Sequence, residues 1–211
     1  MSLFIVFEGG EGCGKSTQAR ALYKKLCYQG IPAVFTIEPG GTLLGAKIRR
    51  ILKNRGNTPI SPESELFLFS ASRAQLLDEV IYPALQAGKI VICDRFSSST
   101  IAYQGYGRRI SISMIEMVNN LTIKNLVPDL TILLDISPEE GLTRRRDLYD
   151  RFESMDLSFH HRVREGYLKI ASLDSNRWDI IDASLPRKEI ACIIWSKIVD
   201  LFKKVSISCN E

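Results

Sequence analysis

The chain has 211 residues, of which 45% are hydrophobic and 25% are charged, and its formal net charge is +4. This length and hydrophobic content suffice for one large domain with a buried core and are short for two domains. The net charge is too small to indicate an anionic partner by itself, and no apolar run approaches the roughly 20 residues of a membrane-spanning helix.

The five cysteines bear on the compartment in which the protein works. They are scattered along the chain, at Cys13, Cys27, Cys93, Cys192 and Cys209. Their odd number and irregular spacing are typical neither of a disulfide framework nor of a zinc site. The first residues contain no basic region leading into an apolar run, so we expect no signal peptide. We therefore expect reduced thiols, a cytoplasmic location and no membrane partner.

Strand-like and helix-like segments alternate along the chain. In chain order, the expected strands are 3–8, 32–38, 89–94, 129–137 and 178–183. The expected helices are 15–29, 42–53, 61 to about 86, one that begins at the capping signal 137–140, and a C-terminal helix containing Ile190, Ile194, Ile198 and Leu201. This alternation predicts one α/β domain over 1–211, with a parallel sheet flanked by helices and ligands at the carboxyl ends of the strands.

The segment 9–17 lies between the first expected strand and the first expected helix, and it matches the phosphate-loop pattern G-x-x-x-x-G-K-[ST]. Backbone N–H groups of such a loop, with the helix N-terminus, bind nucleotide phosphates. Lys15 is expected to reach the β and γ phosphates, Ser16 to ligate Mg²⁺ and Thr17 to help hold the α phosphate. The residues expected to bind ATP are Gly10, Glu11, Gly12, Cys13, Gly14, Lys15, Ser16 and Thr17.

A second group of residues favours a kinase with a small acceptor. Phe69 and Arg73 are four residues apart and therefore share one face of a helix. An aromatic ring beside a guanidinium suits a flat polar heterocycle, although Phe69 taken alone is more typical of a core residue. Asp94 and Arg95 stand at the end of the 89–94 strand, where a charge is costly unless it is used.

A third group is the arginine-rich segment "TRRRDLYDRFE", 143–153, which contains Arg144, Arg145, Arg146 and Arg151. By itself it has two interpretations of similar weight. It is either a solvated basic surface or a mobile lid that brings guanidinium groups to a transferring phosphoryl group. The phosphate loop earlier in the chain favours the lid.

Other classes of protein share the phosphate loop, and they leave different signals. A regulatory GTPase needs an Asn-Lys-x-Asp guanine signature, which the sequence lacks. A DNA-dependent motor needs a long basic track and further domains, for which 211 residues scarcely leave room. We therefore expect no nucleic-acid partner.

The chain strongly resembles the thymidylate kinase family over nearly its whole length. The motifs that carry the resemblance, in order, are "FEGGEGCGKST", "EPGGT", "LFSASR", "DRF", "STIAYQG", "PDLTILLD", "DRFE" and "IDA". It implies a three-layer nucleoside-monophosphate kinase fold, phosphorylation of dTMP to dTDP by ATP with Mg²⁺, and a homodimer. The main alternative is another nucleoside-monophosphate kinase with a different acceptor base.

Family roles carried over to this sequence place a phosphate loop at 9–17, an acceptor-binding region at about 38–75 and a lid at about 141–154. Gly12 stands where one style of the family has arginine, so the resemblance is to the bacterial style, which uses lid arginines. The implied dTMP-binding residues are Glu11, Glu38, Arg49, Phe69, Arg73, Arg95, Thr100, Tyr103 and Gln104. The implied catalytic residues are Glu11, Lys15, Arg95, Arg144, Arg145, Arg146 and Arg151, and the implied Mg²⁺ ligands are Ser16 and Asp94.

The implied reaction does not need a general base. A phosphate monoester has a second pKa of about 6 and is mostly dianionic at neutral pH, so it can attack without losing a proton. Catalysis then depends on alignment and on neutralisation of charge. We accordingly expect His160 and His161 to be surface residues of a helix without a catalytic role.

Overall fold

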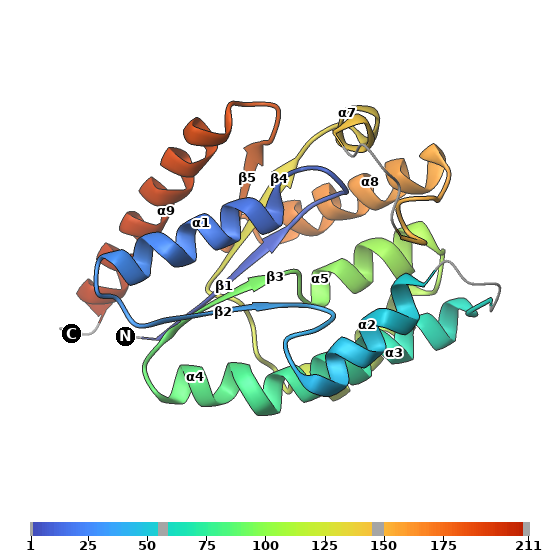
Figure 1. Cartoon of the computed structure of the whole chain (residues 1–211), viewed down its shortest axis with the longest axis horizontal. Helices are drawn as coiled ribbons and strands as arrows, with labels where there is room; N and C mark the ends of the chain where they lie inside the picture. Colours follow the sequence, from blue (N-terminus) through green and yellow to red (C-terminus); the bar gives the residue numbers. More distant parts are fainter. Residues whose placement is uncertain (1, 55–58, 145–149, 209–211) are drawn as a thin grey trace.

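The computed structural model describes residues 2–54, 59–144 and 150–208. Within them, one parallel sheet has the strand order β2-β3-β1-β4-β5 (Figure 1). Its strands are β1 Leu3–Glu8, β2 Ala33–Ile37, β3 Ile90–Asp94, β4 Leu130–Asp135 and β5 Trp178–Asp182. The central strand β1 pairs with both β3 and β4, so the carboxyl ends of these three strands meet at one edge of the sheet.

Helices connect the strands and cover both faces of the sheet (Figure 1). The α-helices are α1 Lys15–Tyr28, α2 Leu43–Lys53, α3 Pro62–Leu76, α4 Tyr82–Gln86, α5 Ser97–Thr100, α6 Ile112–Ile123, α7 Pro138–Thr143, α8 Leu157–Leu173 and α9 Arg187–Ser208. Two π-helical segments, η1 Leu77–Ile81 and η2 Ile101–Gly107, continue α3 and α5. None of the helices in the described part of the chain is long and apolar enough to span a membrane.

Two hydrophobic layers explain the unbroken apolar run of β1. Ile5 and Phe7 are buried against α1 and α9 on one face of the sheet. Phe4 and Val6 are buried on the other face, against the continuous helix formed by α3, η1 and α4. Because every residue of β1 is buried, the strand shows no polar alternation in the sequence. The three-layer α/β architecture predicted from the sequence is confirmed.

Most elements were predicted from the sequence, although not all of the helices were. The five predicted strands are present with ends within two residues of the prediction, and the helix predicted from 61 to about 86 is present as α3, η1 and α4. No helix was predicted at α6, and for α8 the only expectation was that His160 and His161 lie in a helix, without bounds. In α6 the large apolar residues Met117 and Leu121 are exposed, so their spacing does not mark a buried face.

The prediction that His160 and His161 both lie on the surface is wrong for His160. His161 is exposed and pairs with Glu139 at 2.8 Å. His160 is only 5% exposed and stacks edge-on against the buried ring of Phe159. Because no bounds were predicted for this helix, nothing in the sequence showed which of the two neighbouring histidines faces the core.

Burial of His160 predicts a dependence of stability on pH. Burial lowers the pKa of His160 and outweighs the opposing effects of Glu11 and Asp156, while His161 lowers it further. Below about pH 6.5, the usual pKa of histidine, the unfolded chain takes up a proton that the folded protein resists, so the free energy of unfolding falls as the pH falls. We expect this fall to be smaller in His160→Gln. Urea titrations between about pH 7 and pH 5 would measure it.

The matched control is His161→Gln, which changes an exposed histidine next to the buried one. Its stability should follow nearly the same pH dependence as the wild-type protein, because the influence of His161 on the pKa of His160 is small and that of burial is the largest. Equal slopes for wild type and His160→Gln would contradict the assignment of this effect to His160.

Candidate active site

A cavity lies at the carboxyl ends of the strands and encloses about 800 Å³, including its mouth open to solvent. It brings together predicted residues from widely separated parts of the chain. Those that line it are Glu11, Lys15, Ser16, Glu38, Arg49, Phe69, Arg73, Asp94, Arg95, Thr100, Tyr103 and Gln104. Every residue predicted for dTMP binding therefore lies at one cavity, together with both predicted Mg²⁺ ligands and the loop lysine.

The phosphate loop joins β1 to α1. Gly14, directly before α1, has a left-handed backbone with φ of 90°, a conformation that glycine adopts without strain. Lys15 is 7% exposed, and its Nζ donates to the carbonyl oxygen of Gly10 at 2.6 Å and approaches Cys13 Sγ at 3.5 Å. The ammonium thus folds back over its own loop and lines the cavity.

Close contact with α7 restricts the loop at Gly12. Its φ is +69°, and a Cβ built on it would lie 1.8 Å from the carbonyl oxygen of Gly141. The reverse contact is equally tight, since a Cβ on Gly141 would lie 2.3 Å from the carbonyl oxygen of Glu11. A side chain at position 12 therefore does not fit this arrangement, which gives a steric reason for the absence of arginine from the loop.

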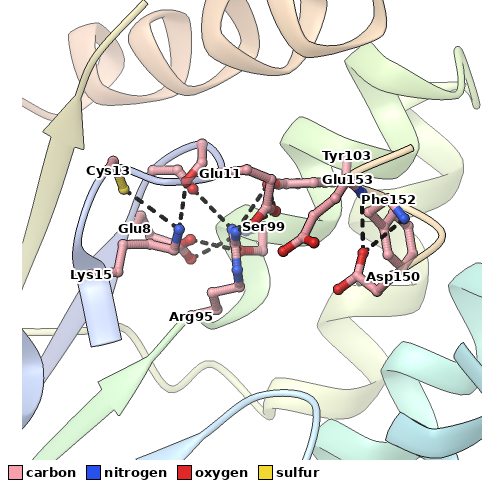
Figure 2. A network of polar contacts seen from close by, with 12 residues as sticks. Glu8, Glu11, Cys13, Lys15, Arg95, Ser99, Tyr103, Asp150, Phe152 and Glu153 are labelled. Carbon is pink, nitrogen blue, oxygen red and sulfur yellow. Dashed lines mark hydrogen bonds and ion pairs between the residues drawn. The ribbon is translucent and has the colours of Figure 1, made fainter. Parts of the chain in front are cut away.

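Arg95 occupies the centre of a polar network at the end of β3 (Figure 2). One terminal nitrogen, Nη1, donates to the carbonyl oxygen of Gly9 at 3.0 Å and to the Tyr167 hydroxyl at 2.9 Å. The other, Nη2, donates to Glu11 Oε1 and to the Tyr103 hydroxyl, both at 2.9 Å. Both terminal nitrogens of Arg95 are engaged by protein groups, so its predicted contact with the dTMP phosphate stays a prediction.

The pKa values of Glu11 and Glu8, the two acids of this network, are shifted in opposite directions. Burial alone would raise the pKa of Glu11, but Arg95, Lys15 and the Tyr103 hydroxyl together hold it well below its usual range. Glu8 is fully buried, and burial raises its pKa although Arg95 opposes the change. Glu11 is therefore the ionised partner of Arg95.

Arg73 forms a second buried cluster on α3. Its side chain is fully buried, Nε donates to Glu38 Oε1 at 2.8 Å, and Nη1 donates to Asn119 Oδ1 at 2.7 Å. Nη2 donates to the Thr100 hydroxyl. Burial raises the pKa of Glu38 despite the nearby Arg73, and Glu38 Oε2 is buried without a hydrogen-bond partner. The cluster places a guanidinium and an unpartnered carboxylate oxygen at the cavity.

Aromatic rings and an amide complete this part of the cavity. Phe69 lies 5.8 Å from Phe152, and Tyr103 lies 6.0 Å from Phe152, measured between ring centroids. Gln104 is 1% exposed, and its Nε2 donates to Glu65 at 2.8 Å. These groups suit a flat ring with polar edges.

Arg49 reaches the same cavity from α2. Its Nη1 donates to the carbonyl oxygen of Pro39 at 2.9 Å, so the guanidinium is held at the "EPGGT" loop that follows β2. Burial lowers the pKa of Arg49, although Asp94 opposes the change. A partly desolvated cation at this position is suited to an anionic ligand.

The predicted lid arginines do not act as one cluster in the structure. Arg144, after α7, donates to the carbonyl oxygen of Ala183 at 2.8 Å and to Glu140 at 2.7 Å. Arg151 instead pairs with the buried carboxylate of Glu65 on α3. Arg145 and Arg146 lie outside the described residues. The two described arginines therefore lie against different elements.

The residues predicted to hold Mg²⁺ lie together. The Ser16 hydroxyl donates to the Asp94 carboxylate, and both side chains line the cavity beside Lys15. Among the residues that the structure describes, no group of three or more His, Cys, Asp or Glu side chains could hold a metal on its own. Mg²⁺ commonly binds through one or two protein oxygens, several waters and the substrate phosphates. The hydroxyl and the carboxylate fit this mode of binding.

A phosphate loop after the central strand of a parallel sheet, with an aromatic and arginine-lined cavity beside it, defines a P-loop kinase of the nucleoside-monophosphate kinase class. The family model described as "Thymidylate kinase" matches residues 7–193 of the chain. The chain belongs to the thymidylate kinase family, and it is a kinase.

Individual relatives agree with the family model. A thymidylate kinase from Dehalococcoides mccartyi is 52% identical over 202 residues, which cover 95% of this chain and 97% of the relative. A thymidylate kinase from Desulforapulum autotrophicum is 46% identical over 205 residues, which cover 93% and 90%. The crystal structure of thymidylate kinase from Ehrlichia chaffeensis matches with a TM-score of 0.75 and 36% identity, covering 94% of this chain and 98% of that one.

Several residues at the cavity were missed by sequence reasoning. Phe152 lines it, and so do Ser99, Lys53 and Asp150. Lys53 and Asp150 form an ion pair at 2.5 Å. Phe152, Asp150 and Ser99 belong to the motifs "DRFE" and "STIAYQG", so a signal was present, but no spacing within those motifs shows which side chain faces a ligand.

The contact between the loop and α7 predicts that Gly12→Ala is destabilising. The left-handed backbone by itself costs a residue with a Cβ about 1–2 kcal/mol, and the collision with Gly141 adds to this cost. Since each kcal/mol lowers the melting temperature of a chain of this size by about 2–4 °C, we expect a decrease of several degrees, measured by calorimetry.

Gly10→Ala is the matched control for stability. Gly10 lies in the same loop without a left-handed φ, and a Cβ there would meet nothing within 4 Å. A melting temperature equal for the two variants would contradict the steric account of position 12.

Proposed function

We propose that the protein transfers the γ-phosphoryl group of ATP to the 5′-phosphate of dTMP, with Mg²⁺, and gives dTDP and ADP. The observation that carries the proposal is that Lys15 of the phosphate loop lines the same cavity as Phe69, Arg73 and Gln104. One end of the cavity suits a nucleoside triphosphate, and the other suits a flat base. Membership of the thymidylate kinase family supports dTMP as the acceptor.

On the donor side, the loop backbone and the N-terminus of α1 bind the phosphates of ATP. Lys15 contacts the β and γ phosphates, and Thr17 helps to hold the α phosphate. Ser16 and Asp94 would hold Mg²⁺, which would supply positive charge to neutralise part of the charge of the phosphates. Asp94 already orients the Ser16 hydroxyl, which supports this pairing of ligands.

On the acceptor side, Phe69 stacks on the thymine, and Arg73 and Gln104 bond the edge of the base. Arg49 with Arg95 holds the 5′-phosphate. Tyr103 crowds the 2′ position, and Glu11 meets the 3′-hydroxyl. The ion pair at 2.9 Å between Arg95 and Glu11 supports these roles, because it keeps both side chains in place before the substrate arrives. Neutralisation of charge in a preorganised site is the main source of catalysis for this reaction.

The two described arginines of the lid segment have different roles in this proposal. Arg144 follows α7, which contacts the phosphate loop at Gly12, so we assign Arg144 to the donor phosphates together with Arg145 and Arg146. Arg151 is paired with Glu65 on α3, so we assign it to the acceptor side.

We also propose a cytoplasmic homodimer. The resemblance to the family implies the dimer, and exposed apolar residues support it. They lie on α2, α3 and α6, of which α3 packs against the other two: Leu43, Ile51, Phe67, Met117 and Leu121. Exposed apolar residues that gather on one surface mark an interaction site, and a second copy of the chain is the partner that we assign to these helices. Free thiols at the described cysteines support the cytoplasm.

A coupled assay of ADP release across dTMP, dUMP, dCMP, dGMP and AMP tests the function. We expect dTMP to have the highest kcat/KM and Lys15→Ala to lower kcat by several orders of magnitude, since the lysine contacts charge that develops in the transition state. The fold of Lys15→Ala should be intact by circular dichroism. Preference for AMP or dGMP, or a Lys15→Ala variant with near wild-type rate, would overturn the proposal.

The separation of the arginines predicts two kinetic phenotypes. Arg144→Ala should lower kcat with little change in the KM for dTMP. Arg151→Ala should raise the KM for dTMP and lower the melting temperature, because it removes an ionic partner from a buried carboxylate. Arg177→Ala, which breaks an exposed pair with Asp174, is the control. It should change neither the kinetic constants nor the melting temperature. Identical effects of Arg144→Ala and Arg151→Ala would contradict the assignment.

A further inference from the structure

Glu65 is a buried carboxylate on α3 that joins three segments of the chain. It is 0% exposed and does not line the cavity. Its Oε1 accepts from Gln104 Nε2 at 2.8 Å and from Arg108 Nε at 3.3 Å. Its Oε2 accepts from Arg108 Nη2 at 3.1 Å and from Arg151 Nη2. One acidic side chain thus binds an amide and two guanidinium groups.

These contacts determine which way the Gln104 amide points. Because guanidinium groups donate to both oxygens of Glu65, this carboxylate acts only as an acceptor of hydrogen bonds here. A side-chain amide has a donating NH₂ at one end and an accepting carbonyl at the other. Glu65 therefore selects the NH₂ end of Gln104, and the carbonyl oxygen is left to face away from Glu65. Since Gln104 also lines the cavity, its carbonyl oxygen can accept a hydrogen bond from a ligand there.

We propose that Glu65 is a positioning residue that sets the base selectivity of the acceptor site through Gln104. The inference rests on the proposed function, in which Gln104 bonds the edge of the base. Thymine and uracil carry an N–H at ring position 3, which a carbonyl oxygen accepts. Cytosine carries a lone pair at that position, which the same oxygen repels. The orientation of one amide thereby favours dTMP and dUMP over dCMP.

Glu65→Gln is predicted to reverse the Gln104 amide. The Oε2 position faces two guanidinium groups, which need an acceptor, so the new glutamine keeps its carbonyl there. Its NH₂ then lies at the Oε1 position, where it faces Gln104 and loses the longer contact, at 3.3 Å, with Arg108 Nε. The Gln104 carbonyl then accepts a hydrogen bond from this NH₂. The NH₂ of Gln104 is left to point toward the cavity, where it can donate to the lone pair on the cytosine ring.

The experiment compares kcat/KM for dTMP, dUMP and dCMP, with calorimetric Kd values for the three nucleotides as a second readout. In Glu65→Gln we expect the preference for dTMP over dCMP to fall by at least about 10-fold, since a mispaired buried hydrogen bond separates the substrates. The preference for dTMP over dUMP should not change, because both bases carry the same N–H. A purely structural effect of the substitution would not separate these two ratios.

Two further variants test whether the effect passes through Gln104. Arg108→Met removes a partner of Glu65 and keeps the contact of Glu65 with Gln104, so the preference for dTMP over dCMP should stay. Gln104→Met removes the amide and should lower that preference by itself. Glu65→Gln added to Gln104→Met should change it no further.

An unchanged preference in Glu65→Gln overturns the inference, and so does an equal loss in Arg108→Met. If Glu65→Gln does not fold, the other two variants decide: a preference kept in Gln104→Met overturns the inference, and one lost there but kept in Arg108→Met supports it. A wild-type protein that neither binds nor phosphorylates dTMP would overturn the proposed function, and the inference with it. Normal turnover of dTMP with an unchanged ratio in Glu65→Gln would overturn the inference alone.

Discussion

The rest of the site depends on one constraint, the positive charge of Arg95 directly after β3. A guanidinium in this largely desolvated position must be paired, and removing one partner of a buried ion pair typically costs about 3–5 kcal/mol. Arg95 binds Glu11 of the phosphate loop and Tyr103 of η2 (Figure 2). It also binds Gly9 of the same loop and Tyr167 of α8. The charge therefore holds the phosphate loop, η2 and α8 in one arrangement.

Ion pairs between an arginine and a buried carboxylate recur around the cavity. Arg73 pairs with Glu38 at 2.6 Å, and Arg151 pairs with Glu65, which is fully buried. In each case a carboxylate from another segment of the chain neutralises and orients a guanidinium. A site organised in this way has its positive groups in position before an anionic substrate arrives, so little reorganisation is needed during phosphoryl transfer. The cavity thus combines high charge with a fixed geometry.

Local patterns in the sequence were sufficient to predict the sheet and the phosphate loop. Strands such as β1 are buried on both faces, so they appear in the sequence as short apolar runs. The loop needs glycine and lysine at set spacings. Family resemblance supplied the set of residues that meet at the cavity. The partners of those residues were not predictable, because they are distant in the sequence: Arg73 meets Glu38 35 positions away and Asn119 46 positions away. Likewise, Arg144 and Arg151 are close in sequence and lie against different elements.

The central claim is that one cavity holds both nucleotides, with ATP at Lys15 and thymidylate at Phe69 and Gln104. A crystal structure with a bisubstrate analogue, in which adenosine and thymidine are joined through a chain of phosphates, tests it most directly. The account predicts that the phosphates lie along the loop beside Lys15 and that the thymine stacks on Phe69 with its ring N–H toward the carbonyl oxygen of Gln104. A thymine bound away from Phe69, or an adenine in its place, would contradict the account.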